Sequence, residues 1–266
     1  MINAIQSHLS KDFPWKDRIH WFDTIDSTNT QAKHMGAQGA PDGTILIADS
    51  QTGGRGRLGR SFHSPGGNGI YLTVLLRPNC HASQLMHLTC ATGIAMCNAV
   101  ETATGLRPGI KWTNDLVFGT RKLGGILTEL CLDSEGNVTY AVVGIGINCN
   151  QSIEEFPEEI RSIATSLAAQ TQAPVDRCKV IAAMLTELYQ MAQTLLNQKD
   201  QMLALYVSDC VTIGKEISVV RADDIRHGTA VGIDQEGALL VRFSNGRIEA
   251  VSSGEVSIRG MYGYVD

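Results

Sequence analysis

The residues best suited to chemistry form a run of glycine and arginine that ends at Arg60. It reads Gly53-Gly54-Arg55-Gly56-Arg57-Leu58-Gly59-Arg60. Its four glycines permit positive φ angles and let the backbone approach a ligand closely. Its three arginines carry permanent charge and planar donors that suit phosphate or carboxylate. The run therefore predicts an anion-binding loop, with phosphate as the favoured anion.

The better-known phosphate loops do not fit this run. A Walker A loop needs G-x-x-x-x-G-K-[ST], and arginines at these positions would crowd the helix N-terminus of a Rossmann fingerprint. Flexible glycine-arginine tails that bind nucleic acid are an alternative. The run lies between two predicted strands, which favours a loop of a packed domain.

A second group of polar residues surrounds a predicted hairpin that turns at Gly119. Lys111-Trp112-Thr113-Asn114-Asp115-Leu116 precedes the turn, and Lys122-Leu123-Gly124-Gly125-Ile126-Leu127 follows it. The two lysines are either ligand-binding groups in one pocket or solvated residues at a strand edge. The glycine pair favours the pocket, because glycine within a strand often marks close approach of a ligand. Asp115 is expected to hold a lysine or a magnesium-bound phosphate, or to be an ordinary turn residue.

A third motif, Gly144-Ile145-Gly146-Ile147-Asn148, is weak by itself because glycines in buried strands are common. Asn148 is able to donate and accept hydrogen bonds with a ligand or a phosphate. It is equally able to satisfy a turn.

The apolar patterns place these motifs on strands, loops and helices. Expected strands cover 19–22, 44–48, 69–76, 110–112, 123–132 and 138–148. Expected helices cover 2–10, a stretch that ends near Met35, 83–104 and 174–206. After Asp209 the chain changes to short alternating strands separated by turn residues, which is typical of a small β-barrel. We therefore predict a catalytic domain over 1–209 and a small domain over 210–266.

Composition narrows the functional classes. The chain has 27 acidic and 22 basic residues and a net charge of -5, a poor balance for a dedicated nucleic-acid binder. Its seven cysteines include no CxxC pair, which favours buried free thiols in a reducing compartment over a zinc site. No signal peptide or membrane-length apolar run is present in the sequence, so we expect a cytoplasmic protein without membrane association.

Five motifs in order resemble the biotin protein ligase family. They are Asp26-Ser27-Thr28-Asn29, Gln51 to Arg60, Lys111 to Leu116, Lys122 to Leu127 and Gly144 to Asn148. The resemblance covers roughly residues 20–150, and the later module fits the family's small SH3-like barrel. It implies an α+β fold, a mixed β-sheet backed by helices, related to the lipoate ligases. It also implies an enzyme that uses ATP and Mg²⁺ to activate biotin as biotinyl-5'-AMP and then biotinylates a lysine of a biotin carboxyl carrier protein.

The resemblance also implies roles for individual residues. Biotin would be bound by Ser27, Thr28, Asn29, Gln51, Gly54, Arg55 and Gly125. ATP or the adenylate would be bound by Arg57, Arg60, Lys111, Asn114, Lys122 and Asn148. Catalysis would involve Arg57, Lys122 and Asp115, and Asp115 would also hold the metal. The sequence departs from the family at Thr113, where proline is common, and at Leu58, where arginine is common, so one loop charge is missing.

Three alternatives remain open at the level of sequence. One is a lipoate or octanoyl ligase or transferase of the same fold. Another is a binding module without catalysis. The third is a biotin-sensing DNA repressor, but about 18 residues precede the first strand, too few for a three-helix DNA module. We expect no nucleic-acid partner and a monomer or homodimer.

Overall fold

The computed structural model describes residues 1–221, 224–252 and 255–258, and within them a main sheet of seven strands in the order β1-β2-β3-β7-β6-β5-β4. These strands are β1 (Ile19–Ile25), β2 (Thr44–Gln51), β3 (Gly69–Leu76), β4 (Gly109–Lys111), β5 (Asp115–Phe118), β6 (Arg121–Leu132) and β7 (Val138–Asn148). β1 and β2 are parallel, and the other neighbouring strands are antiparallel. The expected mixed sheet is confirmed.

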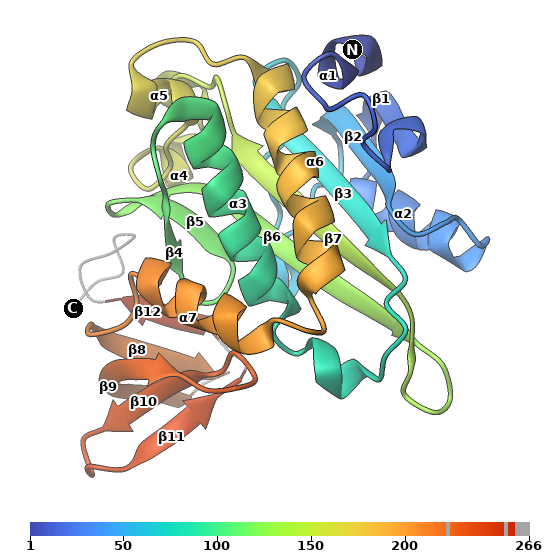
Figure 1. Cartoon of the computed structure of the whole chain (residues 1–266). Helices are drawn as coiled ribbons and strands as arrows, with labels where there is room; N and C mark the ends of the chain where they lie inside the picture. The colour runs from blue at the N-terminus through green and yellow to red at the C-terminus, as the bar shows by residue number, and fades with distance from the viewer. Residues whose placement is uncertain (222–223, 253–254, 259–266) are drawn as a thin grey trace.

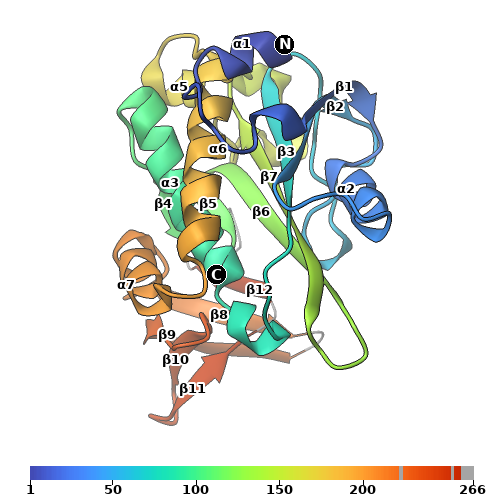
Figure 2. The ribbon, with the colours of Figure 1, turned by 45° about the vertical axis from the view of Figure 1, so that its right-hand side comes forward.

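Helices cover both faces of this sheet. α3 (Leu88–Thr104) and α6 (Arg177–Thr194) lie side by side on one face (Figure 1), and α2 (Thr28–Ala37) lies on the other (Figure 2). Alternate residues of a strand point to opposite faces. Accordingly Ile45 and Ile47 join the large core, whereas Leu46 joins a smaller cluster with Ala32 of α2.

The remaining helices are short or peripheral. They are α1 (Ile2–Gln6), α4 (Glu158–Arg161), α5 (Leu167–Thr171) and α7 (Lys199–Asp209), with 3-10 helices at Lys16–Arg18, Arg57–Gly59, Ala82–Leu85 and Ile153–Glu155. Within the described residues, no helix is long and apolar enough to cross a membrane.

A second sheet follows α7 and lies at the lower end of the molecule in Figure 1. Its order is β11-β10-β9-β8-β12, and every pair is antiparallel. The strands are β8 (Glu216–Arg221), β9 (Asp224–Ile233), β10 (Leu239–Phe243), β11 (Ile248–Val251) and β12 (Glu255–Ile258). This small antiparallel unit agrees with the expected SH3-like module.

Several expected helix boundaries were wrong. The stretch 174–206 is two helices rather than one. α6 begins at Arg177 because the Asp176 side chain caps it, accepting from the backbone of Cys178 and Lys179. α6 ends before Leu195, which is buried and whose carbonyl accepts a hydrogen bond from the buried His87 ring at 2.9 Å. The contact holds the end of α6 against α3, and α7 starts at Lys199.

Two other helices are shorter than expected. The stretch 83–104 is helical as α3 only from Leu88, because a 3-10 turn at Ala82–Leu85 precedes it. The stretch 2–10 is helical only to Gln6, because residues after Ser7 turn toward Phe13, which is buried. All seven cysteines are free thiols, and five of them are buried.

Candidate active site

The N-terminus of α2 forms one wall of a pocket at the edge of the main sheet. β1 and β2 are parallel with Ile25 opposite Gln51, so the residues after β1 return beside Gln51. Gln51 Oε1 accepts hydrogen bonds from Thr28 N at 2.9 Å and Thr28 Oγ1 at 3.1 Å. Ser27 caps the helix. The wall therefore presents neutral hydrogen-bonding groups in fixed positions.

Asn29 is held between two strands and has little freedom to move. Its Oδ1 accepts from Thr73 Oγ1 at 2.7 Å, and its Nδ2 donates to Leu127 O at 3.2 Å and Glu129 Oε2 at 3.0 Å. Gly144 lies directly against it, since a Cβ at that position would be 2.0 Å from Asn29 Oδ1. The sequence predicts no specific contact for Gly144, and the structure shows that any side chain there displaces Asn29.

Glu129 supports this arrangement from β6. Burial raises the pKa of Glu129, but hydrogen bonds from Lys33 and Asn29 outweigh burial and bring the pKa below its usual value. Lys33 Nζ lies 2.7 Å from Glu129 Oε1. Glu129 is therefore ionised at neutral pH and fixes which side of the Asn29 amide faces β6.

The glycine-arginine run forms a small hairpin rather than an open loop. Arg55 bridges Ser61, Gly56 N donates to Arg60 O at 2.7 Å, and Phe62 N donates to Gly54 O at 2.9 Å. The turn is made at Leu58, with φ of 55°, and at Gly59, with φ of 75°. Leu58 is 69% exposed. We call residues 55–61 the arginine hairpin.

Gly54 and Arg57 anchor this hairpin to the rest of the site. A Cβ at Gly54 would lie 2.4 Å from Phe62 O and 2.5 Å from Ser64 Oγ, so this position requires glycine. Arg57 Nη1 donates to Asn114 Oδ1 at 3.0 Å, which joins the hairpin to the segment between β4 and β5. Asn114 in turn donates to Ile126 O at 3.0 Å.

The two lysines of the second motif face the same pocket. β5 pairs with β6 so that Asp115 lies opposite Gly125, and Lys122 Nζ lies 2.7 Å from Asp115 Oδ1. A Cβ on Gly125 would meet Lys122 Nζ at 3.4 Å, so the glycine leaves room above the strand. Lys111 is 7% exposed and lines the pocket from β4. The pocket interpretation of these lysines agrees with this placement.

One pocket brings together most of the predicted site residues. Its lining includes Ser27, Thr28, Asn29, Gln51, Arg55, Arg57, Arg60, Lys111, Asn114, Asp115, Lys122 and Gly125. Its charged lining is five cations, Arg55, Arg57, Arg60, Lys111 and Lys122, against one carboxylate, Asp115. The neutral groups come from the start of α2 and from β2, whereas the cations come from the arginine hairpin, β4 and β6, so the pocket has an excess of positive charge that suits phosphate.

Two predicted residues lie outside this lining. Gly54 is buried beneath the hairpin. Asn148 lies in an adjoining pocket that shares Arg60, Lys111, Asp115 and Lys122 with the first, and its Nδ2 donates to Thr165 O at 3.0 Å. The rest of the adjoining pocket consists of Ser61, His63 and five apolar residues: Phe62, Phe156, Ile160, Ile163 and Ala164. Because they share these lining residues, the two pockets form one continuous cavity.

Sequence reasoning missed several residues that build this cavity. Thr73 could have been singled out from the sequence, because it is the one residue with an aliphatic hydroxyl in the apolar run Gly69–Leu76. In the structure it is fully buried. Glu129 could have been singled out in the same way, because it is the one charged residue in the expected strand 123–132. Phe156 and Ile160 come from a segment without a regular pattern, and their contact with the site depends on the backbone bonds between Lys122 and residues 163 and 165.

The residues around Asp115 do not form a metal site by themselves. Within the described parts of the chain, no group of three or more His, Cys, Asp or Glu side chains is arranged to hold an ion. Asp115 is already engaged by Lys122. The side chains therefore do not fit a magnesium site built by the protein alone.

Comparison with known proteins identifies the class to which this fold and pocket belong. Residues 21–148 match the model described as Biotin/lipoate A/B protein ligase family, and residues 212–259 match the model described as Biotin protein ligase C terminal domain. The "Bifunctional ligase/repressor BirA" of Bacillus subtilis is 34% identical over 239 residues, which cover 90% of this chain and 73% of that protein.

Two further proteins support the assignment. The "Biotin--[acetyl-CoA-carboxylase] ligase" of Mycobacterium tuberculosis is 33% identical, with 86% of this chain and 85% of that protein covered. The structure of the biotin protein ligase from Aquifex aeolicus in complex with biotin and ATP has a TM-score of 0.75 and 32% identity, with 91% and 98% of the two chains covered. This chain belongs to the biotin protein ligase family.

Proposed function

We propose that this chain activates biotin with ATP to form biotinyl-5'-AMP and then transfers biotin to a lysine of a biotin carboxyl carrier protein. The observation that carries the proposal is the continuous cavity, in which neutral hydrogen-bonding groups from α2 and β2 lie together with four cations, Arg57, Arg60, Lys111 and Lys122, and with the apolar side chains of the adjoining pocket. Such a cavity suits a neutral bicyclic ring system joined through its acid group to a nucleotide. The similarity to the Aquifex aeolicus ligase, whose complex holds biotin and ATP, supports it.

In the proposed arrangement, Ser27, Thr28, Asn29 and Gln51 bind the ring system of biotin through hydrogen bonds, with Gly54 and Arg55 supporting that end. Gly125 lets the valeryl chain lie against β6. Arg57, Arg60, Lys111, Asn114 and Lys122 contact the phosphates. Asn148 lies beside the adenylate, and the apolar side chains of the adjoining pocket pack on the adenine.

The first step is an in-line displacement at phosphorus. The biotin carboxylate attacks the α-phosphorus of ATP, a new P–O bond forms, and pyrophosphate leaves with the electrons of the broken bond. Negative charge increases on the phosphate oxygens, so fixed cations stabilise the transition state more than the ground state. Arg57 and Lys122 supply that charge. Magnesium remains a prediction that would depend on the nucleotide's own oxygens.

The second step is attack by a lysine amine of the carrier on the acyl carbon. The C–N bond forms, the C–O bond to phosphate breaks, and AMP leaves. Lysine has a reference pKa of about 10.4, so only about one amine in a few thousand is neutral at pH 7. Asp115 is the carboxylate that lines the described pocket, and we propose it as the acceptor of the amine's proton.

We also infer that the chain divides after Asp209 into a catalytic domain over 1–209 and a C-terminal domain over 210–266. Support comes from the end of α7 at Asp209 and from the separate sheet that begins with β8.

Exchange of labelled pyrophosphate into ATP tests the proposal. Biotin should stimulate exchange and lipoate should not, and the enzyme should then label a biotin carrier domain. Exchange that depends on lipoate or octanoate would favour a lipoate ligase. Absence of any acid-dependent exchange in folded protein would contradict adenylation.

A further inference from the structure

Residues Arg107–Thr113 lead directly into Asn114 and Asp115, and they lie against residues 206–212, where α7 ends. The two stretches run in parallel. Ile110 and Cys210 form a parallel bridge, and Val211 N donates to Ile110 O at 2.9 Å. We call these two stretches the seam. It joins one side of the pocket to the beginning of the C-terminal module.

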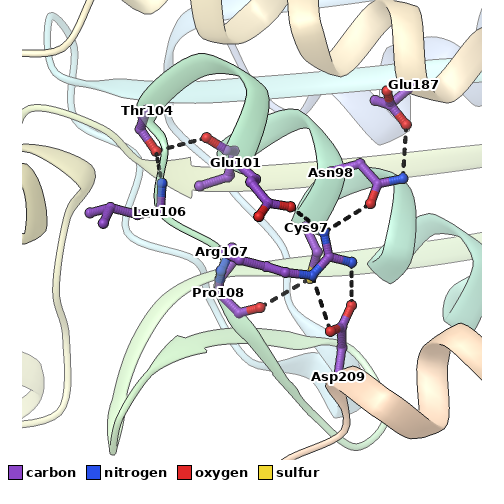
Figure 3. Close-up of polar contacts among 10 residues, drawn as sticks. Cys97, Asn98, Glu101, Thr104, Leu106, Arg107, Pro108, Glu187 and Asp209 are labelled. Carbon is purple, nitrogen blue, oxygen red and sulfur yellow. Dashed lines mark hydrogen bonds and ion pairs between the residues drawn. The ribbon is translucent and has the colours of Figure 1, made fainter.

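The start of the seam is fixed by Arg107, as Figure 3 shows. Its Nε and Nη2 donate to the two oxygens of Asp209, at 3.1 and 2.5 Å. Its Nη1 donates to Asn98 and Glu101 of α3, at 3.0 and 2.6 Å. Bidentate charge-assisted contacts of this kind restrict orientation strongly. The seam therefore begins from a fixed point between α3 and α7.

The other end of the seam holds backbone atoms next to the pocket. Thr212 Oγ1 accepts from Trp112 N at 2.8 Å, and the Tyr206 hydroxyl donates to Thr113 O at 3.1 Å. Tyr206 and Thr212 are both fully buried. Trp112 Nε1 also donates to Gly237 O at 3.0 Å, which ties the same segment to the C-terminal sheet.

These contacts determine where Asn114 and Asp115 lie. Thr113 O is one peptide unit from Asn114, whose side chain accepts from Arg57, and Asp115 pairs with Lys122. A displacement of the backbone at 112–113 would therefore move the partners of Arg57 and Lys122, two of the proposed phosphate-binding cations. Neither Tyr206 nor Thr212 is among the residues that line the pocket.

We propose that Tyr206 and Thr212 are positioning residues for the adenylation step, because they fix the backbone that orients Asn114 and Asp115 toward Arg57 and Lys122. The inference rests on the proposed function. It gives the C-terminal module a specific role in catalysis. Thr212 and Gly237 act through Trp112, without contact with substrate.

The test uses Tyr206→Phe and Thr212→Val, each of which removes one hydrogen-bonding hydroxyl and keeps the shape. Biotin-dependent pyrophosphate exchange should fall about tenfold in kcat/KM for ATP, the effect of losing about 1.4 kcal/mol of transition-state stabilisation. The KM for biotin should stay within about twofold, because Thr28 and Gln51 are held by hydrogen bonds to each other and not by the seam. Thr212→Ser keeps the hydroxyl and should restore most of the activity.

Tyr140→Phe is the matched control. Tyr140 is also buried and donates to a backbone carbonyl, Lys33 O, at 3.2 Å, but it lies on the α2 face of the sheet. It should lower Tm as much as Tyr206→Phe does and leave kcat/KM for ATP unchanged. Equal kinetic losses in the two variants would overturn the inference.

A double-mutant cycle separates positioning from general destabilisation. In an Asn114→Ala background, Tyr206→Phe should cost clearly less than tenfold, because the part of its effect that passes through Asn114 is already lost. A full tenfold loss in that background would show independent action and contradict the inference. If Tyr206→Phe does not fold, the Thr212→Val and Thr212→Ser pair decides the question. Wild-type protein without biotin-dependent exchange would instead reject the proposed function.

Discussion

Lys122 Nζ lies 2.7 Å from Asp115 Oδ1, so the cation that follows the hairpin turn and the carboxylate of the pocket form one ion pair between β5 and β6. The lysine side chain is 33% exposed and lines the pocket. An ammonium group has three donor hydrogens, so Lys122 can keep Asp115 in place and contact a phosphate oxygen together.

Lys122→Ala should remove adenylate formation while the fold persists, because Lys122 contributes little to the core and its backbone bonds do not need the side chain. Loss of one charged contact to a transition-state phosphate costs about 3 kcal/mol, or about a hundredfold in rate. Arg121→Ala, at the exposed neighbouring position, is the control and should be nearly silent. A folded Lys122→Ala enzyme with normal exchange kinetics would show that the assignment is wrong.

Gly144→Ala should weaken biotin binding at least tenfold. The new Cβ would lie 2.0 Å from Asn29 Oδ1, and Asn29 is held by Thr73 and Glu129 on its other sides. Gly232→Ala makes the same chemical change in β9, where the nearest atom is 3.7 Å away, and should leave binding intact. Calorimetric titration with biotin measures both. Unchanged affinity in Gly144→Ala would remove Asn29 from the biotin end of the cavity.

The arginine hairpin should act as a cover that biotin and ATP order. Its glycines enlarge the ensemble of open states, and fixing each backbone residue costs about 1–2 kcal/mol. Trypsin should cut after Arg55, Arg57 and Arg60 rapidly without ligand and slowly with biotin and ATP. Protection should be partial, because Leu58 replaces a charge. The exposed Arg247 is the control site and should be cut equally in both conditions. Slow cutting of the arginine hairpin without ligand would contradict the prediction that biotin and ATP order it.

Thiol reactivity should follow burial. Burial raises the pKa of Cys90, Cys97 and Cys149 to about 12, so at pH 8 only about one in ten thousand of each is thiolate. Iodoacetamide should modify Cys131 and Cys178, which are half-buried, before the five buried thiols. Urea should make all seven reactive. Mass spectrometry of the native protein would count against the packed structure if Cys97 were labelled early.

Local patterns were sufficient for most of the sheet and for the motifs of the cavity. β3 agrees with its apolar run residue for residue, and β7 was expected to within the same bounds. The reason is that each strand is apolar and bounded by glycine, proline or asparagine. The motifs were recognisable because glycine, arginine and lysine have few structural reasons to gather between strands.

Contacts distant in sequence were beyond local patterns. The residue after α6, Leu195, is bonded to His87, which lies 108 residues away in the sequence. The seam depends on pairs such as Trp112 and Thr212, 100 residues apart. Nothing in the apolar spacing of 174–206 distinguishes one long helix from two, because both bury the same stripe of residues.

The sheet order also sets a sequence of events during synthesis. β1, β2 and β3 are complete once residue 76 has been made. The edge of β3 that does not pair with β2 has no partner until β7 is made, because Gly69 pairs with Asn148 of β7. Closing such a long loop is entropically costly and slow. The nascent chain thus carries an apolar strand without a partner on one edge until β7 has been translated, so chaperone dependence should be greatest in that interval. The ligand cavity cannot be completed until Ala164 has been made.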